Sequence, residues 1–534
     1  MPDIDFLLVS QSNVVDYEGF GDLPLDRLDI YKTLVYPRMV HHEGRFRSHL
    51  DYVNRKIYGK YYAEGDYAER RQMYNIWNLA SMAGVHLANY LRQFGINVRV
   101  INNLDSEWDW FCEAYQSSSR PPLVGISSTF YLTWKEVGRL AKRLRGVDPD
   151  MEIVLGGAFA NAMTQGSGTP ADFETPMKRY GIRHVLHAFN SEIDLRDLIL
   201  AHKAHKAVDA VHNLCTLENG KNFTGTTVQW NNPLLDEIPP TWDELELPFL
   251  NHTIQIRTAS GCPFSCAFCS YPTTAGAWKT VKSDTVRAHL DSVMRIPGIK
   301  NIIFIDDTFN VPPHRFKELI KIFADYPFEW FSFLRVQYAD EEVIRMMKDS
   351  GCRGVYLGIE SASDAVLKNM NKRARKADFA RGVNLLNKYD IDYLAAFVLG
   401  FPGETEETIQ ENVDFISDNG VRYYSLKEFY YMEHTQVHDK REEYGLTGMG
   451  AKWAHDTMSY ERAADIKIDL FQSIGNSTHV DPDTSLWHMA YLYDRGHSFA
   501  EIRALQDEIN TEIKAQIASN LPADNPSVES AAAE

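Results

Sequence analysis

The stretch IQIRTASGCPFSCAFCSYP, residues 254–272, joins a short apolar strand to a loop that carries three cysteines. Cys262, Cys266 and Cys269 follow the spacing C-x3-C-x2-C, and the Pro and Ser residues among them indicate a loop. Three thiolates on one loop can bind three irons of a [4Fe–4S] cluster, and the fourth iron then stays open to another ligand. The sequence therefore predicts an iron–sulfur site directly after a strand, with these three cysteines as its metal ligands.

A zinc site and a set of ordinary buried thiols are the alternatives to an iron–sulfur cluster at these cysteines. Zinc usually takes paired C-x2-C units or a fourth Cys or His at regular spacing, and none follows here. The remaining cysteines, Cys112, Cys215 and Cys352, are scattered, and six cysteines in 534 residues are too few for a disulfide framework. This usage favours a reducing compartment.

Strand and helix patterns alternate on the carboxyl side of the cysteine loop. Helical stretches separate six apolar segments that suit buried strands: IQIRTA, NIIFIDD, WFSFLRV, GVYLGIE, YLAAFVLGF and RYYSLKEF. Repeated strand–helix units of this kind build a curved parallel sheet. We predict an α/β fold with an open, partial parallel (β/α)6 barrel over residues 251–430, then a helical region over 431–534 that ends in a disordered tail.

A second α/β unit precedes this predicted barrel. Apolar runs that suit strands lie at residues 4–9, 98–101, 123–128 and 152–157, and helical patterns lie at 74–91 and 134–145. This order predicts a doubly wound, Rossmann-like domain over residues 1–200. Within it, residues 11–73 show no clear period and are an unassigned elaboration. Residues 201–250, rich in Pro and acid toward their end, predict a linker.

The charge composition disfavours some classes of binding partner. The chain has 55 Lys and Arg against 73 Asp and Glu, a net charge of −18 with His neutral. This excess of acid disfavours nucleic acid or an anionic membrane as the main partner. The amino-terminal residues have no secretion signal pattern, and no stretch reaches the ~18 apolar residues of a membrane span. We expect a cytoplasmic protein that acts on a small molecule or a peptide.

Residues from about Thr253 to Tyr431 resemble the radical S-adenosylmethionine (SAM) superfamily, because several separated motifs accompany the cysteine spacing. The resemblance implies that the open iron binds the amino and carboxylate groups of SAM. It also implies reductive cleavage of SAM to a 5′-deoxyadenosyl radical, with a reductant such as flavodoxin or ferredoxin as partner. In the same family an aromatic residue at the position of Phe268 packs beside the cluster and the adenine.

Further SAM contacts are implied by the same resemblance. Asp307, in FIDDTF, stands where the family contacts the SAM amino group, although acids replace the usual glycine-rich signature. GVYLGIES supplies Gly358, Glu360 and Ser361 at the site for the ribose hydroxyls and the amino acid part. GFPGET supplies Gly400 and Pro402 in the turn beside the adenine.

Arg335 is a candidate on chemical grounds. It ends the predicted strand WFSFLRV, and parallel barrels place their chemistry at the carboxyl ends of strands. A guanidinium there could pair with the methionyl carboxylate of SAM. The alternative is a surface salt bridge.

The run from about Tyr74 to Leu200 resembles the cobalamin-binding domain of cobalamin-dependent radical SAM enzymes. Small residues at two strand ends stand where that family receives the nucleotide tail and the corrin edge: Gly125, Ser127, Ser128, Gly156 and Gly157. Glycine permits close backbone approach, and hydroxyls can bond polar ligand groups. The alternative is that these residues simply end buried strands.

Two features depart from the cobalamin-binding pattern. The nearest version of the D-x-H-x-x-G motif is MVHHEG, where Met39 replaces Asp, so we expect no histidine on the lower face of cobalt and an ordinary surface role for His41. HAFNSEIDL, residues 187–195, occupies the place of a glycine-rich acidic turn.

Within the superfamily, the motifs look most like the phosphinate P-methyltransferase type and related natural-product methyltransferases. This resemblance implies a cobalamin-dependent radical SAM methyltransferase. Its methyl group would pass from SAM through methylcobalamin to an unactivated carbon or phosphorus of a biosynthetic intermediate. One alternative is a cobalamin-dependent radical enzyme that rearranges or oxidises its substrate, and another is an iron–sulfur electron carrier or sensor. The sequence identifies no catalytic acid or base.

Overall fold

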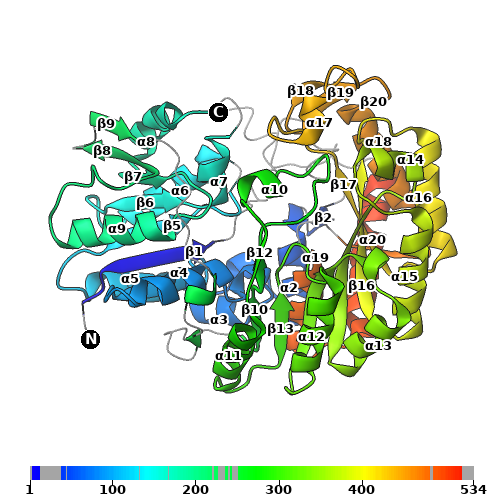
Figure 1. Ribbon diagram of the computed structural model, residues 1–534, viewed down its shortest axis with the longest axis horizontal. Coiled ribbons are helices and arrows are strands. Elements are labelled where there is room, and N and C mark those ends of the chain that lie inside the picture. Colours follow the sequence, from blue (N-terminus) through cyan, green and yellow to red (C-terminus); the bar gives the residue numbers. More distant parts are fainter. Residues whose placement is uncertain are drawn as a thin grey trace.

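Two seven-stranded sheets organise the chain in the computed structural model (Figure 1). The structure describes residues 3–12, 38–43, 45–131, 133–165, 168–218, 220, 222–226, 235–238, 241–242, 251–480 and 485–519. The first sheet belongs to the amino-terminal part of the chain, and the second, drawn from green to yellow in Figure 1, to the carboxyl-terminal part.

The first sheet has the strand order β4-β1-β5-β6-β7-β8-β9. Its members are β1 (Phe6–Gln11), β4 (Val98–Asn103), β5 (Leu123–Ser127), β6 (Ile153–Gly156), β7 (His184–Leu186), β8 (Leu214–Glu218) and β9 (Asn222–Gly225). The first five are parallel. Apolar runs predicted β1, β4, β5 and β6, because strands covered by helices on both faces are apolar throughout, but did not predict β7. Its helices include α4 (Met82–Arg92), α5 (Trp108–Gln116), α6 (Trp134–Arg145) and α9 (Glu192–Lys203).

The prediction of a linker over residues 201–250 is wrong for the first half of that range. There β8 and β9 form an antiparallel hairpin that extends the first sheet beyond β7. Leu214, Cys215 and Leu217 are buried in the core of that sheet, which favours strand over linker. Most of the Pro-rich remainder, including 227–234 and 243–250, lies outside the described residues.

The helix predicted over residues 74–91 begins later than expected, at Met82. A short 3-10 turn, Ile76–Asn78, precedes it, and the Ser81 side chain caps the helix by accepting from the Gly84 amide. The carbonyl of Asn78 accepts side-chain amides from Asn102 and from Asn251, at 3.1 and 2.8 Å. These tertiary bonds hold the preceding backbone away from the helical path.

The second sheet is an open parallel barrel with the order β10-β13-β14-β15-β16-β17-β21. Its strands are β10 (Thr253–Ile256), β13 (Asn301–Phe304), β14 (Glu329–Leu334), β15 (Cys352–Glu360), β16 (Asp392–Leu399), β17 (Tyr423–Glu428) and β21 (Thr478–His479). The first six match the predicted strands, and the two-residue β21 adds a seventh at the edge. Outer helices include α11 (Ser283–Met294), α12 (Pro313–Phe323), α13 (Glu341–Asp349), α15 (Lys376–Lys388) and α16 (Glu406–Asp418).

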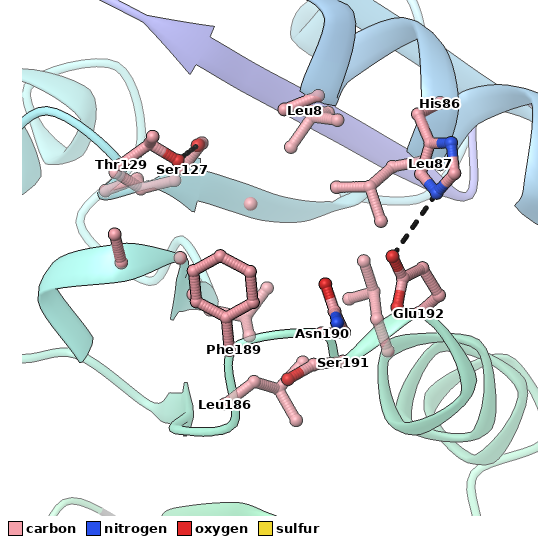
Figure 2. A pocket seen from close by; sticks show the side chains of 18 of the residues that line it. Leu8, His86, Leu87, Ser127, Thr129, Leu186, Phe189, Asn190, Ser191 and Glu192 are labelled. Carbon is pink, nitrogen blue, oxygen red and sulfur yellow. Dashed lines mark hydrogen bonds and ion pairs between the residues drawn. The ribbon is translucent and has the colours of Figure 1, made fainter. Parts of the chain in front are cut away.

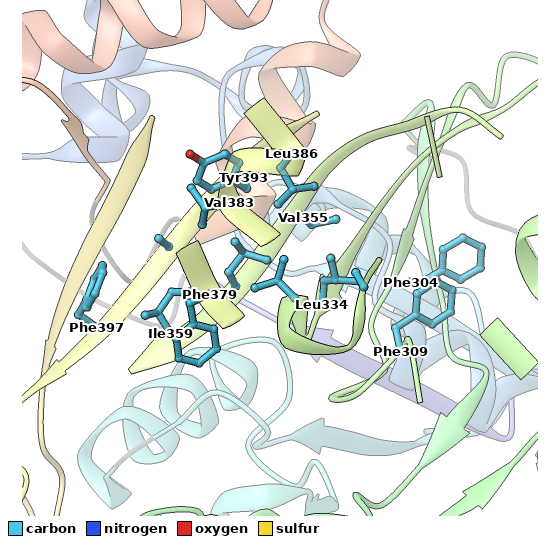
Figure 3. Close-up of a cluster of buried hydrophobic side chains, with 14 of the residues drawn as sticks. Phe304, Phe309, Leu334, Val355, Ile359, Phe379, Val383, Leu386, Tyr393 and Phe397 are labelled. Atoms are coloured by element: carbon cyan, nitrogen blue, oxygen red, sulfur yellow. The ribbon is translucent and has the colours of Figure 1, made fainter. Parts of the chain in front are cut away.

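The main hydrophobic core lies between the barrel strands and these outer helices (Figure 3). On α15, Phe379, Val383 and Leu386 are four and three residues apart and so share one helix face. On β13, Phe304 stacks against Phe323 of α12 with ring centroids 4.5 Å apart. This packing fixes the strand ends, and with them the loops that follow.

Segments from both ends of the chain pack on the other face of the same sheet. Ile303, which neighbours Phe304 and therefore points the opposite way, lies in a cluster with Val40 and Tyr52 and with Ile509 of the terminal helix α20 (Phe499–Ala518). The Tyr491 hydroxyl, on α19 (Ser485–Asp494), donates to the Met73 carbonyl at 2.7 Å. Residues 38–73 of the elaboration, which the structure describes except for 44, therefore help to fill the barrel.

Helices predominate near the carboxyl terminus, as predicted, but residues 447–459 form a small antiparallel sheet of β18 (Thr447–Met449), β19 (Lys452–His455) and β20 (Met458–Ser459). The predicted disordered tail lies outside the described residues. Among the helices that the structure describes, none is both long and apolar enough to cross a bilayer.

Candidate functional site

The carboxyl edges of the two sheets meet at the cysteine loop. Arg257, directly after β10 of the barrel, lines a cavity whose other walls belong to the first sheet. Tyr271, which begins α10 (Tyr271–Thr274) just after the cysteine loop, contacts Phe189, which follows β7, with ring centroids 5.9 Å apart. Figure 1 places α10 beside the first sheet. A ligand in the cavity would therefore lie next to the cysteine loop.

The cysteine loop is held by its backbone. Gly261 has φ +73°, and a Cβ there would lie 2.9 Å from the Gly276 carbonyl oxygen, so only glycine fits this turn. The Ala267 amide donates to the Met370 carbonyl at 2.8 Å, and the Ala267 carbonyl accepts from the Val437 amide at 2.9 Å. The loop is thus clamped between two segments that follow different barrel strands.

Each of the three thiols has a distinct environment. Cys266 is buried, and its Sγ accepts from Arg335 Nη2 at 3.2 Å. Cys262 Sγ lies 3.2 Å from Thr308 Oγ1. Burial raises the pKa of the Cys269 thiol to about 12, so a metal must displace its proton to bind. As the side chains stand, no three His, Cys, Asp or Glu side chains among the described residues converge on a single metal ion.

Arg335, predicted from its place at a strand end, is not part of a surface salt bridge. Its guanidinium carbon lies 3.6 Å from the ring centroid of Phe264, and Asn310 bonds both its backbone amide and its carbonyl, each at 2.9 Å. Its Nη1 is buried, and no described residue bonds it. One nitrogen of the guanidinium thus faces the Cys266 thiol, while another is free for a ligand.

The two aspartates that follow β13 differ in burial and in their hydrogen bonds. Asp306 is fully enclosed and accepts from the Thr258 and Ala259 amides at 2.6 and 2.9 Å, which ties β13 to the start of the cysteine loop. Asp307 is exposed, and desolvation by its surroundings raises the pKa of its carboxyl despite its hydrogen bond with Tyr271. Only Asp307 is available to a ligand.

Glu360 belongs to a compact ion pair at the barrel mouth. Its Oε1 lies 2.9 Å from Lys372 Nζ, and the two side chains are 14% and 6% exposed. A Cβ on Gly358 would come within 2.4 Å of that same carboxylate oxygen. Glu360 has φ +64°, an uncommon conformation for a residue other than glycine. Gly358 and Lys372 therefore fix the position of the carboxylate.

The other predicted SAM contacts lie in the walls around this mouth. Ser361 is fully buried, and its hydroxyl accepts from the Ser363 amide at 3.1 Å. Gly400 has φ +82°, and a Cβ there would collide with the Trp453 ring at 2.2 Å. Pro402 is buried, and Phe268 packs edge-on against Phe401 with centroids 6.3 Å apart. Ser361 and Gly400 therefore stabilise the backbone around the mouth of the barrel.

The cavity at the edge of the first sheet has a volume of about 190 Å³ and mostly apolar walls (Figure 2). Leu8, Leu87 and Leu186 line it, and the hydroxyl residues Ser127 and Thr129 lie at one end. At the other end, His86 Nε2 lies 3.3 Å from Glu192 Oε1. Glu192 Oε2 is buried without a partner among the described residues.

Four of the five predicted cobalamin contacts line this cavity, namely Gly125, Ser127, Gly156 and Gly157. Ser128 does not line it, because its amide and hydroxyl both bond the Gly156 carbonyl, at 2.6 and 2.7 Å. This pair of bonds ties the end of β5 to that of β6. His41 lies in the β2 strand (Met39–His42), and its side chain is outside the described part of the structure.

Sequence reasoning missed several residues of the site. No role was predicted for Arg257, His86, Glu192 or Lys372, and the fold brings them to the cavity or the barrel mouth. Phe189 and Asn190 come from the segment that departs from the family pattern, yet both line the cavity. The one available signal was for Arg257, which lies near the carboxyl end of the predicted strand IQIRTA.

Comparison with known proteins finds a family match in part of the chain. Residues 256–416 match the Radical SAM superfamily. An uncharacterized methyltransferase of Pyrococcus horikoshii is 28% identical over 318 residues, which are 57% of this chain and 65% of that protein. The bacteriochlorophyllide d C-12(1)-methyltransferase of Chlorobaculum tepidum is 30% identical over 179 residues, 32% of this chain and 38% of that protein. The aligned regions thus span about two thirds or less of these relatives.

Two solved structures share the fold over most of the chain. The radical SAM methyltransferase TsrM of Kitasatospora setae, with cobalamin and a [4Fe–4S] cluster bound, has a TM-score of 0.56 at 17% identity, covering 82% of this chain and 78% of that one. The cobalamin-dependent SAM radical enzyme OxsB, with aqua-cobalamin bound, has a TM-score of 0.51 at 16% identity, covering 82% and 55%. At such identities the likeness establishes the fold, in which an α/β sheet precedes the barrel.

Proposed function

We propose that this chain, whose residues 256–416 carry a radical SAM domain, is a cobalamin-dependent methyltransferase that takes its methyl group from SAM. The observation that carries the proposal is the cavity at the edge of the first sheet, because Arg257 of the barrel completes its wall only five residues before Cys262. A cofactor seated there would lie next to the cysteine loop.

The cysteine loop fits a [4Fe–4S] cluster bound by Cys262, Cys266 and Cys269. The thiols share one clamped loop, and a permanent cation, Arg335, donates to one of them. Such a cation stabilises the thiolate that binding iron requires. When bound, the cluster supplies an open iron for SAM and the electron that cleaves it.

The barrel mouth fits SAM on the same side. Arg335 Nη1, buried without a partner among the described residues, can bond the methionyl carboxylate. Glu360, held by Lys372, and the exposed Asp307 are acceptors for its amino group and ribose hydroxyls. These groups would orient the sulfonium, and the surrounding apolar walls would exclude water.

The cavity fits the nucleotide tail of cobalamin. Its apolar walls suit a flat aromatic base, and the orphaned Glu192 Oε2 can accept from a ribose hydroxyl, since a buried acceptor without a donor is costly. Cobalamin would carry the methyl group, while this chain holds the tail and so fixes the corrin between the sheets.

We propose an unactivated carbon or phosphorus of a natural-product intermediate, free or in a peptide, as the methyl acceptor. The methyltransferase relatives support the reaction class, whereas the P-methyltransferase likeness rests on the motifs alone. A cytoplasmic location, as the cysteine usage favours, would keep the cluster in a reducing environment.

The test is anaerobic reconstitution with iron, sulfide and cobalamin, followed by SAM whose methyl group carries deuterium. With a reductant present, we expect labelled methylcobalamin and S-adenosylhomocysteine from methyl transfer to cob(I)alamin, and 5′-deoxyadenosine from reductive cleavage of SAM. Formation of 5′-deoxyadenosine without labelled methylcobalamin would favour a rearranging or oxidising enzyme. Formation of neither adenosyl product, with an intact cluster, would favour an electron carrier.

A further inference from the structure

We infer that the basic segment, residues 368–376, is the docking surface for an acidic one-electron donor protein. The segment, KNMNKRARK, joins α14 (Asp364–Asn369) to α15. It carries five cations and no carboxylate in a chain whose net charge is −18. The inference rests on the proposed function, because it presumes a redox-active cluster at the cysteine loop.

The basic segment is bonded directly to the residues on either side of Cys266. The Ala267 amide donates to the Met370 carbonyl at 2.8 Å, and Asn371 Nδ2 donates to the Ser265 carbonyl at 2.8 Å. A protein seated on this segment is therefore separated from a cluster ligand by one hydrogen bond and a few covalent bonds. Electron transfer falls off steeply with distance, so this is a favourable point of entry.

Three of the five cations are free to meet a partner. Lys368, Arg373 and Arg375 are exposed, and none has an ion pair or a side-chain hydrogen bond in the part of the chain that the structure describes. The other two turn to carboxylates of this chain, Lys372 to Glu360 at 2.9 Å and Lys376 to Glu411 at 3.8 Å. Unpaired surface cations project a field that attracts and orients an acidic protein.

The negative charge on the rest of the chain restricts the orientation in which an acidic protein can approach. An acidic protein is repelled over most of a surface with net charge −18, so the basic segment selects one orientation of approach. A nucleic acid, whose charge extends along its whole length, would also cross acidic surface such as Glu442 and Glu443, both exposed. A compact acidic donor therefore fits the segment better.

The step that docking serves is a single electron transfer. The reduced centre of the donor loses one electron, the oxidised cluster gains it, and no bond forms or breaks. Complementary charge raises the rate of encounter rather than the driving force, so its loss should appear in the second-order rate constant.

The experiment compares two triple variants of the reconstituted full chain. The test variant is Lys368→Glu, Arg373→Glu and Arg375→Glu. The matched control is Lys300→Glu, Lys321→Glu and Arg345→Glu, which changes the net charge equally at exposed residues on the outside of the barrel. Stopped-flow absorbance follows reduction of the cluster by flavodoxin hydroquinone at about 0.05 M and about 0.5 M salt, and by dithionite as a small reductant.

We expect the test variant to be reduced by flavodoxin about tenfold more slowly than wild type at low salt, with the difference closing at high salt. The control variant should lose less than about twofold, and dithionite should reduce all three alike. Equal slowing of both variants, or no slowing, would overturn the inference. Loss of iron from the test variant would reveal that the charge reversal damages the cysteine loop. In that case the variant with Gln at the same three positions should still be reduced more slowly by flavodoxin, but not by dithionite.

Failure of the proposed function looks different in this experiment. A wild-type chain that dithionite cannot reduce, or that binds no four-iron cluster, contradicts the proposed function itself. A cluster that dithionite reduces normally, with flavodoxin rates insensitive to the basic segment, contradicts only the docking surface. If an acidic peptide competed for methyl transfer but not for reduction by flavodoxin, the segment would belong to substrate binding and the docking inference would be wrong.

Discussion

Arg335 Nη2 donates to Cys266 Sγ across 3.2 Å, which couples the end of β14 to the cysteine loop that follows β10. The ring of Phe264 packs against the guanidinium, and the Asn310 side-chain amide donates to the Arg335 backbone carbonyl. A cation so restrained would keep its position when the proposed cluster gains or loses an electron. It is therefore suited to adjust the electron affinity of the site.

Replacing Arg335 with Gln should make the cluster harder to reduce. Reduction adds negative charge beside a cation that donates a charge-assisted hydrogen bond, so loss of both should lower the midpoint potential by roughly 40–90 mV, or ~1–2 kcal/mol for one electron. A redox titration followed by electron paramagnetic resonance measures this potential. Asn310→Ala, which leaves the guanidinium but frees its backbone, should give a smaller shift. An unchanged potential in Arg335→Gln would remove Arg335 from this role.

The Glu360–Lys372 pair should control SAM affinity. Lys372→Met leaves a buried carboxylate unpaired, which should destabilise the protein by about 3 kcal/mol and weaken SAM binding. Glu360→Gln should weaken SAM binding with a smaller loss of stability. Calorimetric titration with SAM and denaturant unfolding separate the two effects in a double-mutant cycle. SAM affinity that is unchanged in both single variants would place the ligand elsewhere.

The sequence predicted what depends on local pattern. Six barrel strands, four strands of the first sheet and the loop of Cys262 follow from apolar runs and turn residues, because burial on both faces leaves a continuous signal. Packing between segments that are distant in the sequence leaves no such signal in the local pattern. Tyr52 and Ile509 meet inside the barrel from opposite ends of the chain, and His86 meets Glu192 across 106 residues. The β8–β9 hairpin was missed because its strands are short and lie in a polar region.

The three cysteines of the loop should be the only protein ligands of one four-iron cluster. Changing any of Cys262, Cys266 or Cys269 to Ala should abolish the visible absorbance of the cluster and the activity, because each holds one iron. Cys215→Ala is the matched control, since Cys215 is buried in the core of the first sheet. Iron and sulfide analysis of anaerobic protein measures the outcome. Four irons retained in the triple Ala variant would contradict this assignment.

Glu404 should make folding stability depend on pH. Burial raises the pKa of its carboxyl to about 8, although the Gly400 amide donates to it. In the unfolded chain the group ionises near its ordinary pKa, so between that value and pH 8 the folded state holds the extra proton. Stability therefore falls as pH rises through this window, by up to ~1.4 kcal/mol per unit.

Glu404→Gln should remove this dependence. Denaturant unfolding at intervals between pH 5 and pH 8 should find the variant close to wild type at the acidic end and more stable than wild type at the alkaline end. The Gln carbonyl can still accept from the Gly400 amide, so the cap of this turn is kept. Parallel pH profiles for the two proteins would show that Glu404 ionises normally.

Cobalamin bound to this chain should have its dimethylbenzimidazole displaced and no histidine in its place. In the described part of the cavity wall, His86 contributes the one imidazole, and Glu192 holds its Nε2 at 3.3 Å, away from the role of a metal ligand. A lower face without a strong donor should make methylcobalamin readier to release its methyl group as a radical or cation equivalent, which suits a poorly nucleophilic acceptor.

Cob(II)alamin on the protein should then give an electron paramagnetic resonance spectrum without nitrogen superhyperfine splitting, and His86→Ala and His41→Ala should leave that spectrum unchanged. Three-line splitting that disappears in one of these variants would make that histidine the lower ligand. Failure of the wild-type chain to bind cobalamin would instead favour a radical enzyme that works without it.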